Sequence, residues 1–168
     1  MVAAQKGYKI ILTMSEGMSE ERKKILKSFG AKLILTPKKM GTDGAIIKAH
    51  KILKREPKKY WMPNQFSNYI NPETHYNTTA KEILNDIPSI THFIAGIGTS
   101  GTIMGVSKRL REYNPNIQTI AVEPLLGHKI QGLKNMEESI IPEIYNSNNY
   151  NEKINIKDKD VYNTVKKL

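Results

Sequence analysis

The chain has 168 residues, of which 39% are hydrophobic and 25% are charged, a composition typical of a soluble globular domain. It contains no cysteine, which excludes disulfides, thiolate metal sites and a cysteine nucleophile. No apolar run approaches the roughly 20 residues that a membrane-spanning helix needs, and the first residues are too few for a signal peptide, so the expected location is the cytoplasm.

The net charge of +10 is concentrated in the first third of the chain. Residues 1–60 hold 15 Lys and Arg against 5 Asp and Glu, whereas residues 61–168 hold 11 of each. A basic segment can bind nucleic acid. Here the basic run at residues 22–27 shares a helical pattern with Ile25, Leu26 and Phe29, which favours a solvated helix with one apolar face. A nucleic-acid partner is therefore not expected, and a weak nucleic-acid-binding module is kept as an alternative.

The pattern of apolar and turn residues predicts alternating helices and strands. A first short helix ends at Gly7, and Ser19 caps a second helix that ends before Gly30. Residues 63–79 are rich in Asn and Pro and favour a long loop. Further helices are predicted at residues 41–55 (with Ile46, Ile47, Ala49, Ile52 and Leu53 as the buried stripe), at 79–85, from Ile103, and from Asp158 or Asp160. Strands are predicted at residues 8–14, 31–35, 60–62, 92–97, 118–122 and 154–156.

This alternation predicts an α/β fold with doubly wound, mostly parallel sheets. The first helix has only six residues before its stop, and the last one ends without a capping residue. Isolated helices below roughly 12 residues are marginal, so both termini are expected to lie inside elements of a larger fold.

Residues 92–113 hold the most informative pattern. An apolar strand is followed by a turn of five small residues, Gly98, Thr99, Ser100, Gly101 and Thr102, and then by a helix. The first N–H groups of a helix have no internal partner, and the helix dipole adds positive charge there. Such a turn binds anions, and the hydroxyl groups can donate as well. The pattern predicts a site for the phosphate of a cofactor.

Two other interpretations of this turn remain open. Gly96, Gly98 and Gly101 also satisfy G-x-G-x-x-G, and Glu123 ends the next strand, as in a dinucleotide-binding half-domain. The turn could also serve only close packing. A metal site is not expected, since the four histidines are scattered with no pair at ligand spacing.

Several segments together resemble the pyridoxal-phosphate enzymes of fold type II (tryptophan synthase β-like), specifically cysteine synthase, or O-acetylserine sulfhydrylase. Residues 14–31 resemble the family's M-S-x-E-R-R-K-x-L-x-x-F-G-A segment. Residues 64–73 resemble Q-Q-F-x-N-x-x-N-P, and residues 95–102 resemble the cofactor-phosphate loop. Residues 132–136 with 141–145 are closer to the B-type isozymes. Ser100 stands where many members have glycine, and Ala80-Lys81 stands where Gly-Pro is usual.

The resemblance implies pyridoxal phosphate as cofactor, held at residues 98–102, and an amino-acid substrate whose carboxylate Gln65 helps to hold. It implies β-replacement on O-acetylserine or O-phosphoserine with a sulfur donor, and a homodimer. Residues 1–62 would belong to the smaller N-terminal domain and residues 63–168 to the larger cofactor-binding domain. The family's Schiff-base lysine lies in an S-x-K-D-R segment that does not occur here, so the chain is expected to be an internal fragment with no catalytic residue of its own.

Overall fold

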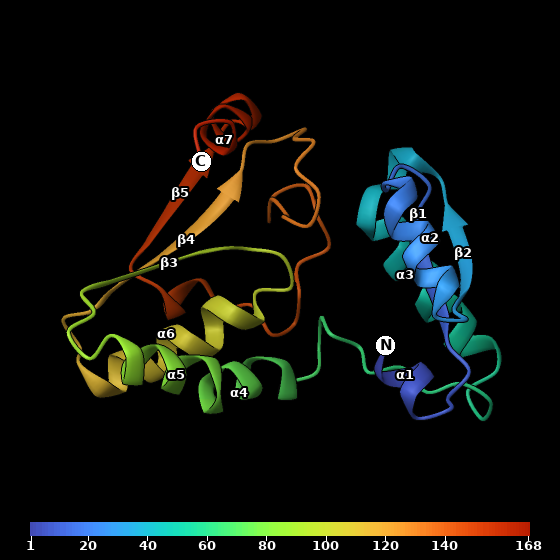
Figure 1. Ribbon diagram of the computed structural model, residues 1–168, viewed down its shortest axis with the longest axis horizontal. Helices are drawn as coiled ribbons and strands as arrows, with labels where there is room; N and C mark the ends of the chain where they lie inside the picture. Colours follow the sequence, from blue (N-terminus) through green and yellow to red (C-terminus); the bar gives the residue numbers. More distant parts are fainter. The chain divides into compact units, whose positions relative to one another are not determined.

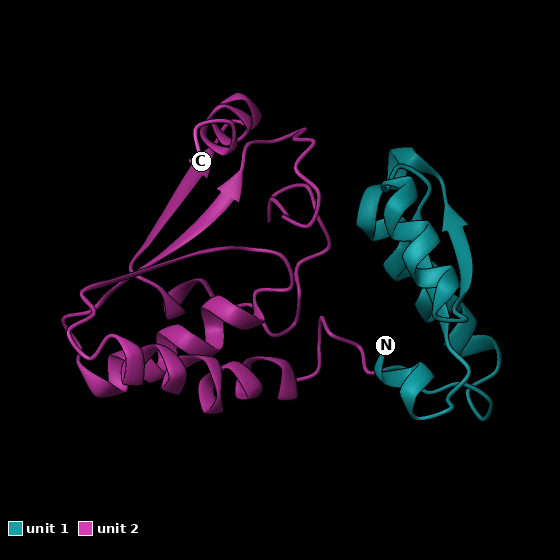
Figure 2. Cartoon of the chain, viewed as in Figure 1, with its two compact units in different colours: residues 1–62 teal, residues 63–168 magenta.

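The computed structural model describes all residues from 1 to 168, and the chain forms two compact units. Unit 1 comprises Met1–Met62 and unit 2 comprises Pro63–Leu168 (Figure 2). Each unit contains a parallel sheet with helices packed against it (Figure 1). Helices and strands alternate along the chain as the pattern of the sequence predicts, except that three successive helices between residues 41 and 86 have no strand between them.

Unit 1 is built on a pair of parallel strands. Its elements are α1 (Val2–Gln5), β1 (Ile11–Ser15), α2 (Glu20–Ser28), β2 (Lys32–Thr36), the short helix η1 (Lys38–Met40) and α3 (Gly41–Arg55). Ile11 lies opposite Lys32, and the two strands stay in register to Ser15 and Thr36. The hydroxyl of Thr13 on β1 donates to the carbonyl oxygen of Ala45 on α3 at 2.8 Å, which holds α3 against the sheet.

The capping predictions in unit 1 are confirmed. The hydroxyl of Ser19 accepts from the N–H of Arg22 at the start of α2, and Gly7 and Gly30 follow their helices with φ of +72° and +78°. The predicted buried stripe of α3 is partly wrong, because Gly44 and Ala45 are its buried residues while Ile47 is exposed. The sheet of unit 1 has only two strands, so it covers a narrower face of α3 than a full sheet would.

Unit 2 contains a three-stranded parallel sheet in the order β3-β4-β5. Its elements are α4 (Ile70–Asn77), α5 (Thr79–Asp86), β3 (His92–Gly96), α6 (Gly101–Tyr113), β4 (Gln118–Pro124), η2 (Ser147–Asn149), β5 (Glu152–Ile156) and α7 (Asp158–Val165). His92 lies opposite Gln118, and Ile120 lies opposite Glu152. The helix α6 packs against β3 and β4 on one side and against α4 and α5 on the other (Figure 1).

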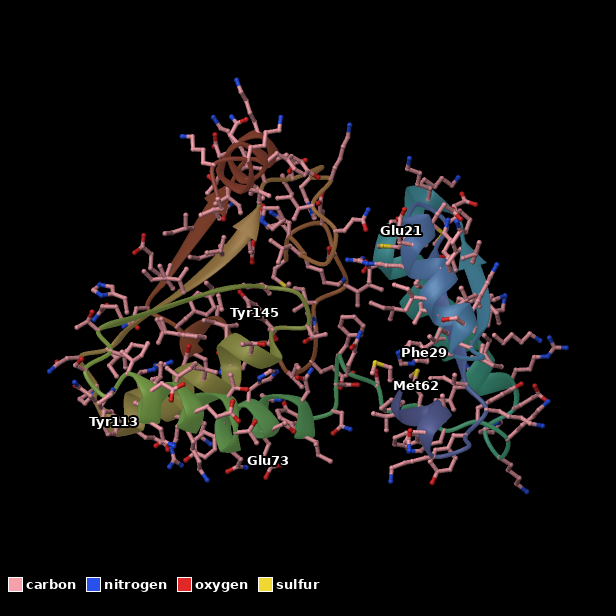
Figure 3. The ribbon with its side chains drawn as sticks, in the orientation of Figure 1. Glu21, Phe29, Met62, Glu73, Tyr113 and Tyr145 are labelled. Atoms are coloured by element: carbon pink, nitrogen blue, oxygen red, sulfur yellow. The ribbon has the colours of Figure 1, made fainter.

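The core of unit 2 surrounds α6. Its two buried clusters comprise Ile97, Ile103, Met104, Ala121 and Met136 in the first, and Ala80, Val106, Leu110 and Ile117 in the second. Tyr145 packs against the first cluster (Figure 3), and its hydroxyl lies 2.6 Å from that of Tyr150. Burial, together with this hydrogen bond, raises the pKa of Tyr145 above its ordinary value, so the phenol stays neutral.

Two predictions about the middle of the chain are wrong. Residues 60–62 form no strand: Trp61 is 83% exposed and no strand lies beside it for pairing. Residues 63–79 are not mostly loop, because they contain the helix α4. Pro72 is the third residue of α4, where no backbone N–H is needed for the helix, so a proline there starts the helix instead of breaking it.

Candidate functional site

The turn between β3 and α6 presents unpaired backbone donors. The N–H of Ile97 is still part of the sheet, since it donates to the carbonyl oxygen of Val122 at 2.9 Å. Beyond it, five backbone N–H groups have no hydrogen-bond partner, those of Gly98, Thr99, Ser100, Thr102 and Ile103. They precede or open α6, where the helix dipole favours an anion.

Ser100 has an unusual conformation in this turn. Its φ is +73°, in the left-handed region that costs a non-glycine residue roughly 1–2 kcal/mol. The residue is only 3% exposed, and its hydroxyl is buried without a hydrogen-bond partner. A buried unpaired hydroxyl is costly to the folded chain.

The helix α4 supports the turn from behind. The side-chain amide of Asn71 donates to the hydroxyl oxygen of Thr99 at 3.2 Å, and the Nε2 atom of His75 lies 3.3 Å from the hydroxyl of Thr102. Asn71 and His75 are four residues apart, so they share one face of the helix. Neither role could be inferred from the sequence, because these contacts join residues 27 and 28 positions apart.

Glycines on α6 allow this close approach of α4. A Cβ atom at Gly101 would stand 1.9 Å from Oδ1 of Asn71, and one at Gly105 would stand 2.1 Å from the backbone oxygen of Pro72. At the far end of the contact, the hydroxyl of Tyr76 donates to Glu112, and the side chains of Lys108 and Arg109 lie over the Tyr76 ring. The position of the two threonine hydroxyls therefore depends on how closely α4 packs on α6.

Gln65 is connected to the turn through its backbone. Its carbonyl oxygen accepts from the same Asn71 amide group at 2.8 Å, while its side chain is exposed and forms no hydrogen bond. One asparagine thus joins the segment that carries Gln65 to the Gly98–Thr102 turn. The substrate role of Gln65 stays a prediction.

Lys134 lies near the turn, and no pattern in the sequence marks it as a site residue. Its backbone N–H donates to the carbonyl oxygen of Ile97 at 2.8 Å, and the residue is only 4% exposed. Its ammonium group lies 5.4 Å from the centre of the Phe66 ring, beside Gln65. Its Nζ atom also donates to the carbonyl oxygen of Ile140 at 3.4 Å, so this side chain joins the Ile140 region to the segment that carries Gln65.

The structure gives no support to the dinucleotide interpretation of Glu123. This side chain is fully buried, and its Oε2 atom lies 3.3 Å from the ammonium group of Lys153. A carboxylate in this position cannot reach a ribose at the surface. No group of three or more His, Asp or Glu side chains is arranged to hold a metal ion, and no helix has the length and apolarity needed to cross a membrane.

Comparison with known proteins identifies the family. The family described as "Pyridoxal-phosphate dependent enzyme" matches residues 1–167. The chain belongs to the pyridoxal-phosphate-dependent enzymes. This confirms the resemblance that the sequence motifs indicated, and with it the α/β fold with parallel sheets.

Relatives of this pyridoxal-phosphate enzyme chain include curated cysteine synthases. It is 45% identical to a cysteine synthase of Aquifex aeolicus, covering all of this chain and 52% of the relative. It is 38% identical to cysteine synthase B of Pseudomonas aeruginosa, covering 56% of that protein. A hydrogen sulfide-producing enzyme from Fusobacterium nucleatum superimposes on the whole chain with a TM-score of 0.91, at 37% identity, and is covered to 59%. The chain therefore spans about half the length of the relatives it matches.

Replacing Ser100 by glycine is expected to raise stability and weaken anion binding at once. Glycine tolerates the left-handed φ without strain and removes the unpaired hydroxyl. These two gains in folding free energy exceed the entropic cost of ordering a glycine by about 1 kcal/mol. The loss of one donor lowers affinity for a phosphate ligand by about two- to fivefold. Urea unfolding and a phosphate titration measure the two effects.

Ser107→Ala is the control variant, because it removes another buried unpaired hydroxyl, within α6. A Ser100→Gly protein less stable than the unaltered chain would contradict the strain at this position.

Proposed function

We propose that the Gly98–Thr102 turn holds the phosphate of pyridoxal phosphate. The observation that carries this proposal is the set of five unpaired backbone N–H groups together with the buried, unpaired Ser100 hydroxyl. Thr99 and Thr102 add two hydroxyls that α4 holds in place. Glycine at 98 and 101 lets the Gly132 backbone and the Asn71 side chain pack against the turn, since a Cβ there would stand 2.8 Å from the Gly132 oxygen and 1.9 Å from Asn71 Oδ1. These groups fit a phosphate monoester, which offers three acceptor oxygens.

The reaction supported best is that of a cysteine synthase. In it, acetate leaves from the β-carbon of O-acetylserine, or phosphate from that of O-phosphoserine, and the sulfur of a sulfur donor takes its place, in the biosynthesis of cysteine. Bound pyridoxal phosphate supplies an electron sink for the bonds at the substrate α-carbon. Gln65, attached to the turn through Asn71, would contact the amino-acid substrate. The curated relatives named cysteine synthase support this function, and the buried Glu123 argues against a dinucleotide.

We infer that none of these 168 residues is the lysine that carries the covalent part of this reaction. The motif that carries it in cysteine synthases, S-x-K-D-R, does not occur in the sequence, and the chain spans about half of its relatives. We therefore assign to this chain the binding of the cofactor phosphate and of the substrate, in the cytoplasm, and no catalytic residue.

Self-association is expected as well. The strands β1 and β2 pair only with each other, and β3 and β5 each leave one edge unpaired. On the face of β3 turned away from the core, Ile94 is 60% exposed. Unpaired strand edges beside apolar residues offer a template for a second copy of the chain. Sedimentation at several protein concentrations measures this, and a monomer at every concentration would contradict it.

Binding of a cofactor analogue tests the proposed site. Pyridoxamine phosphate is the suitable ligand, because it lacks the aldehyde that would react with surface lysines. We expect it to bind to the purified chain, with pyridoxamine, which has no phosphate, bound at least tenfold more weakly. A Thr102→Val variant removes one donor and should weaken binding by about three- to tenfold.

Two results would contradict the proposal. Equal affinity for pyridoxamine and its phosphate would mean that the turn does not hold the phosphate. Displacement of the ligand by a dinucleotide, or a tighter interaction with single-stranded nucleic acid than with the analogue, would favour one of the alternative functions.

A further inference from the structure

Asn71 makes two contacts that no other side chain of the site combines. Its Nδ2 atom lies 2.8 Å from the carbonyl oxygen of Gln65 and 3.2 Å from the hydroxyl oxygen of Thr99. A carbonyl oxygen can only accept, so the nitrogen of the Asn71 amide must face Gln65. Both N–H bonds of this amide group are then used, one toward each partner.

This arrangement determines the direction of the Thr99 hydroxyl. Its oxygen accepts from Asn71 and also from the backbone N–H of Gly101, at 3.4 Å. With both acceptor positions used, the hydroxyl proton is free to donate to an anion in the turn. Asn71 thus prepares Thr99 as a donor and does not compete with the anion for it.

The Asn71 side chain is packed directly against the turn at Gly101. The Cβ of any residue larger than glycine at position 101 would lie only 1.9 Å from the Asn71 Oδ1 atom, which is too close for the two atoms to coexist. Displacement of Thr99 or Gly101 is therefore passed directly to the amide group, and from there to the Gln65 carbonyl.

We propose that Asn71 is a positioning residue that couples occupancy of the Gly98–Thr102 turn to the conformation of the segment carrying Gln65. The proposal rests on the phosphate site proposed above. A phosphate that accepts from Thr99 fixes its hydroxyl, strengthens the Asn71 contact and orders the Gln65 peptide group. By linkage, a ligand that orders Gln65 also raises the affinity for phosphate. The segment for the substrate is thus formed fully only when the cofactor phosphate is in place.

Amide NMR with pyridoxamine phosphate tests the coupling. The amide of Phe66 belongs to the same peptide group as the Gln65 carbonyl, so its chemical shift reports on the Asn71 contact. In the unaltered chain this amide should shift as the ligand binds. In Asn71→Ala the affinity should fall by about three- to tenfold, and at saturation the Phe66 amide should no longer respond.

Two further variants sharpen the test. Asn71→Asp keeps the shape of the side chain but replaces the donor by a carboxylate, so Thr99 would donate to it and the affinity should fall by more than tenfold. Asn68→Ala is the matched control: it loses side-chain hydrogen bonds of 3.0 Å to Pro63 and Ile70 in the same segment, without touching the turn. It should keep the Phe66 response and an affinity within about twofold of the unaltered chain.

The outcomes separate the two proposals. If the unaltered chain binds the ligand but Asn71→Ala and Asn71→Asp keep the full Phe66 response at saturation, the coupling is overturned while the phosphate site stands. If the unaltered chain does not bind pyridoxamine phosphate, the phosphate site is overturned, and the coupling with it. Should Asn71→Ala fail to fold, the isosteric Asn71→Asp decides the question by its Phe66 response.

Discussion

No measurable cysteine is expected from the purified 168-residue chain when it is supplied with pyridoxal phosphate, O-acetylserine and sulfide. The reaction requires a lysine that forms a covalent bond to the cofactor and then moves protons. A residue that acts covalently cannot be replaced by a neighbouring group through proximity alone. The expected effect is therefore a loss of activity to the level of the uncatalysed reaction, even where the cofactor phosphate is bound at residues 98–102.

This result requires a positive control for binding. The same preparation should bind pyridoxamine phosphate, so that absence of activity is not simply absence of cofactor. Any enzymatic turnover by the chain alone would contradict the assignment. The first residue to test would then be Lys134, which is buried and joined through its backbone to Ile97, ahead of the exposed Lys129. A Lys134→Met variant that lost the turnover would identify it as the substitute.

Local patterns allowed much of the fold to be predicted from the sequence. The Ser19 cap, the stops at Gly7 and Gly30, and the strand, turn and helix of residues 92–113 all depend on residues close together in the chain. Each of these signals has a physical cause that acts within one or two turns of backbone. The structure therefore has these elements where the sequence predicts them.

The parts that could not be predicted depend on distant partners. The composition of residues 63–79 favours a loop, yet Ile70–Asn77 is helical because it packs on α6, whose glycines admit it. The three residues 60–62 have strand-like side chains but no neighbouring strand, so they remain irregular. Likewise, the glycines and hydroxyls of the turn indicate an anion site from the sequence alone, whereas the roles of Asn71 and His75 depend on contacts made across the fold.

Replacing Gly105 by alanine is expected to have the largest effect on stability of any single methyl group added to unit 2. The new Cβ would stand 2.1 Å from the backbone oxygen of Pro72, and 2.9 Å from both the His75 Cβ and the backbone nitrogen of Tyr76. Backbone atoms cannot rotate away as a flexible side chain can, so α4 must separate from α6. Overpacking of this kind costs about 3 kcal/mol, a large part of the 5–15 kcal/mol that stabilises a typical domain.

The same change should also abolish phosphate binding, since α4 carries Asn71 and His75 to the hydroxyls of Thr99 and Thr102. Urea unfolding and a titration with pyridoxamine phosphate measure the two losses. Gly17→Ala is the matched control: its Cβ would meet only the exposed side chain of Lys38 at 2.7 Å, which can move aside at little cost. A Gly105→Ala chain that unfolds at the same urea concentration as Gly17→Ala and still binds the analogue would show that α4 does not need its close contact with α6 to support the turn.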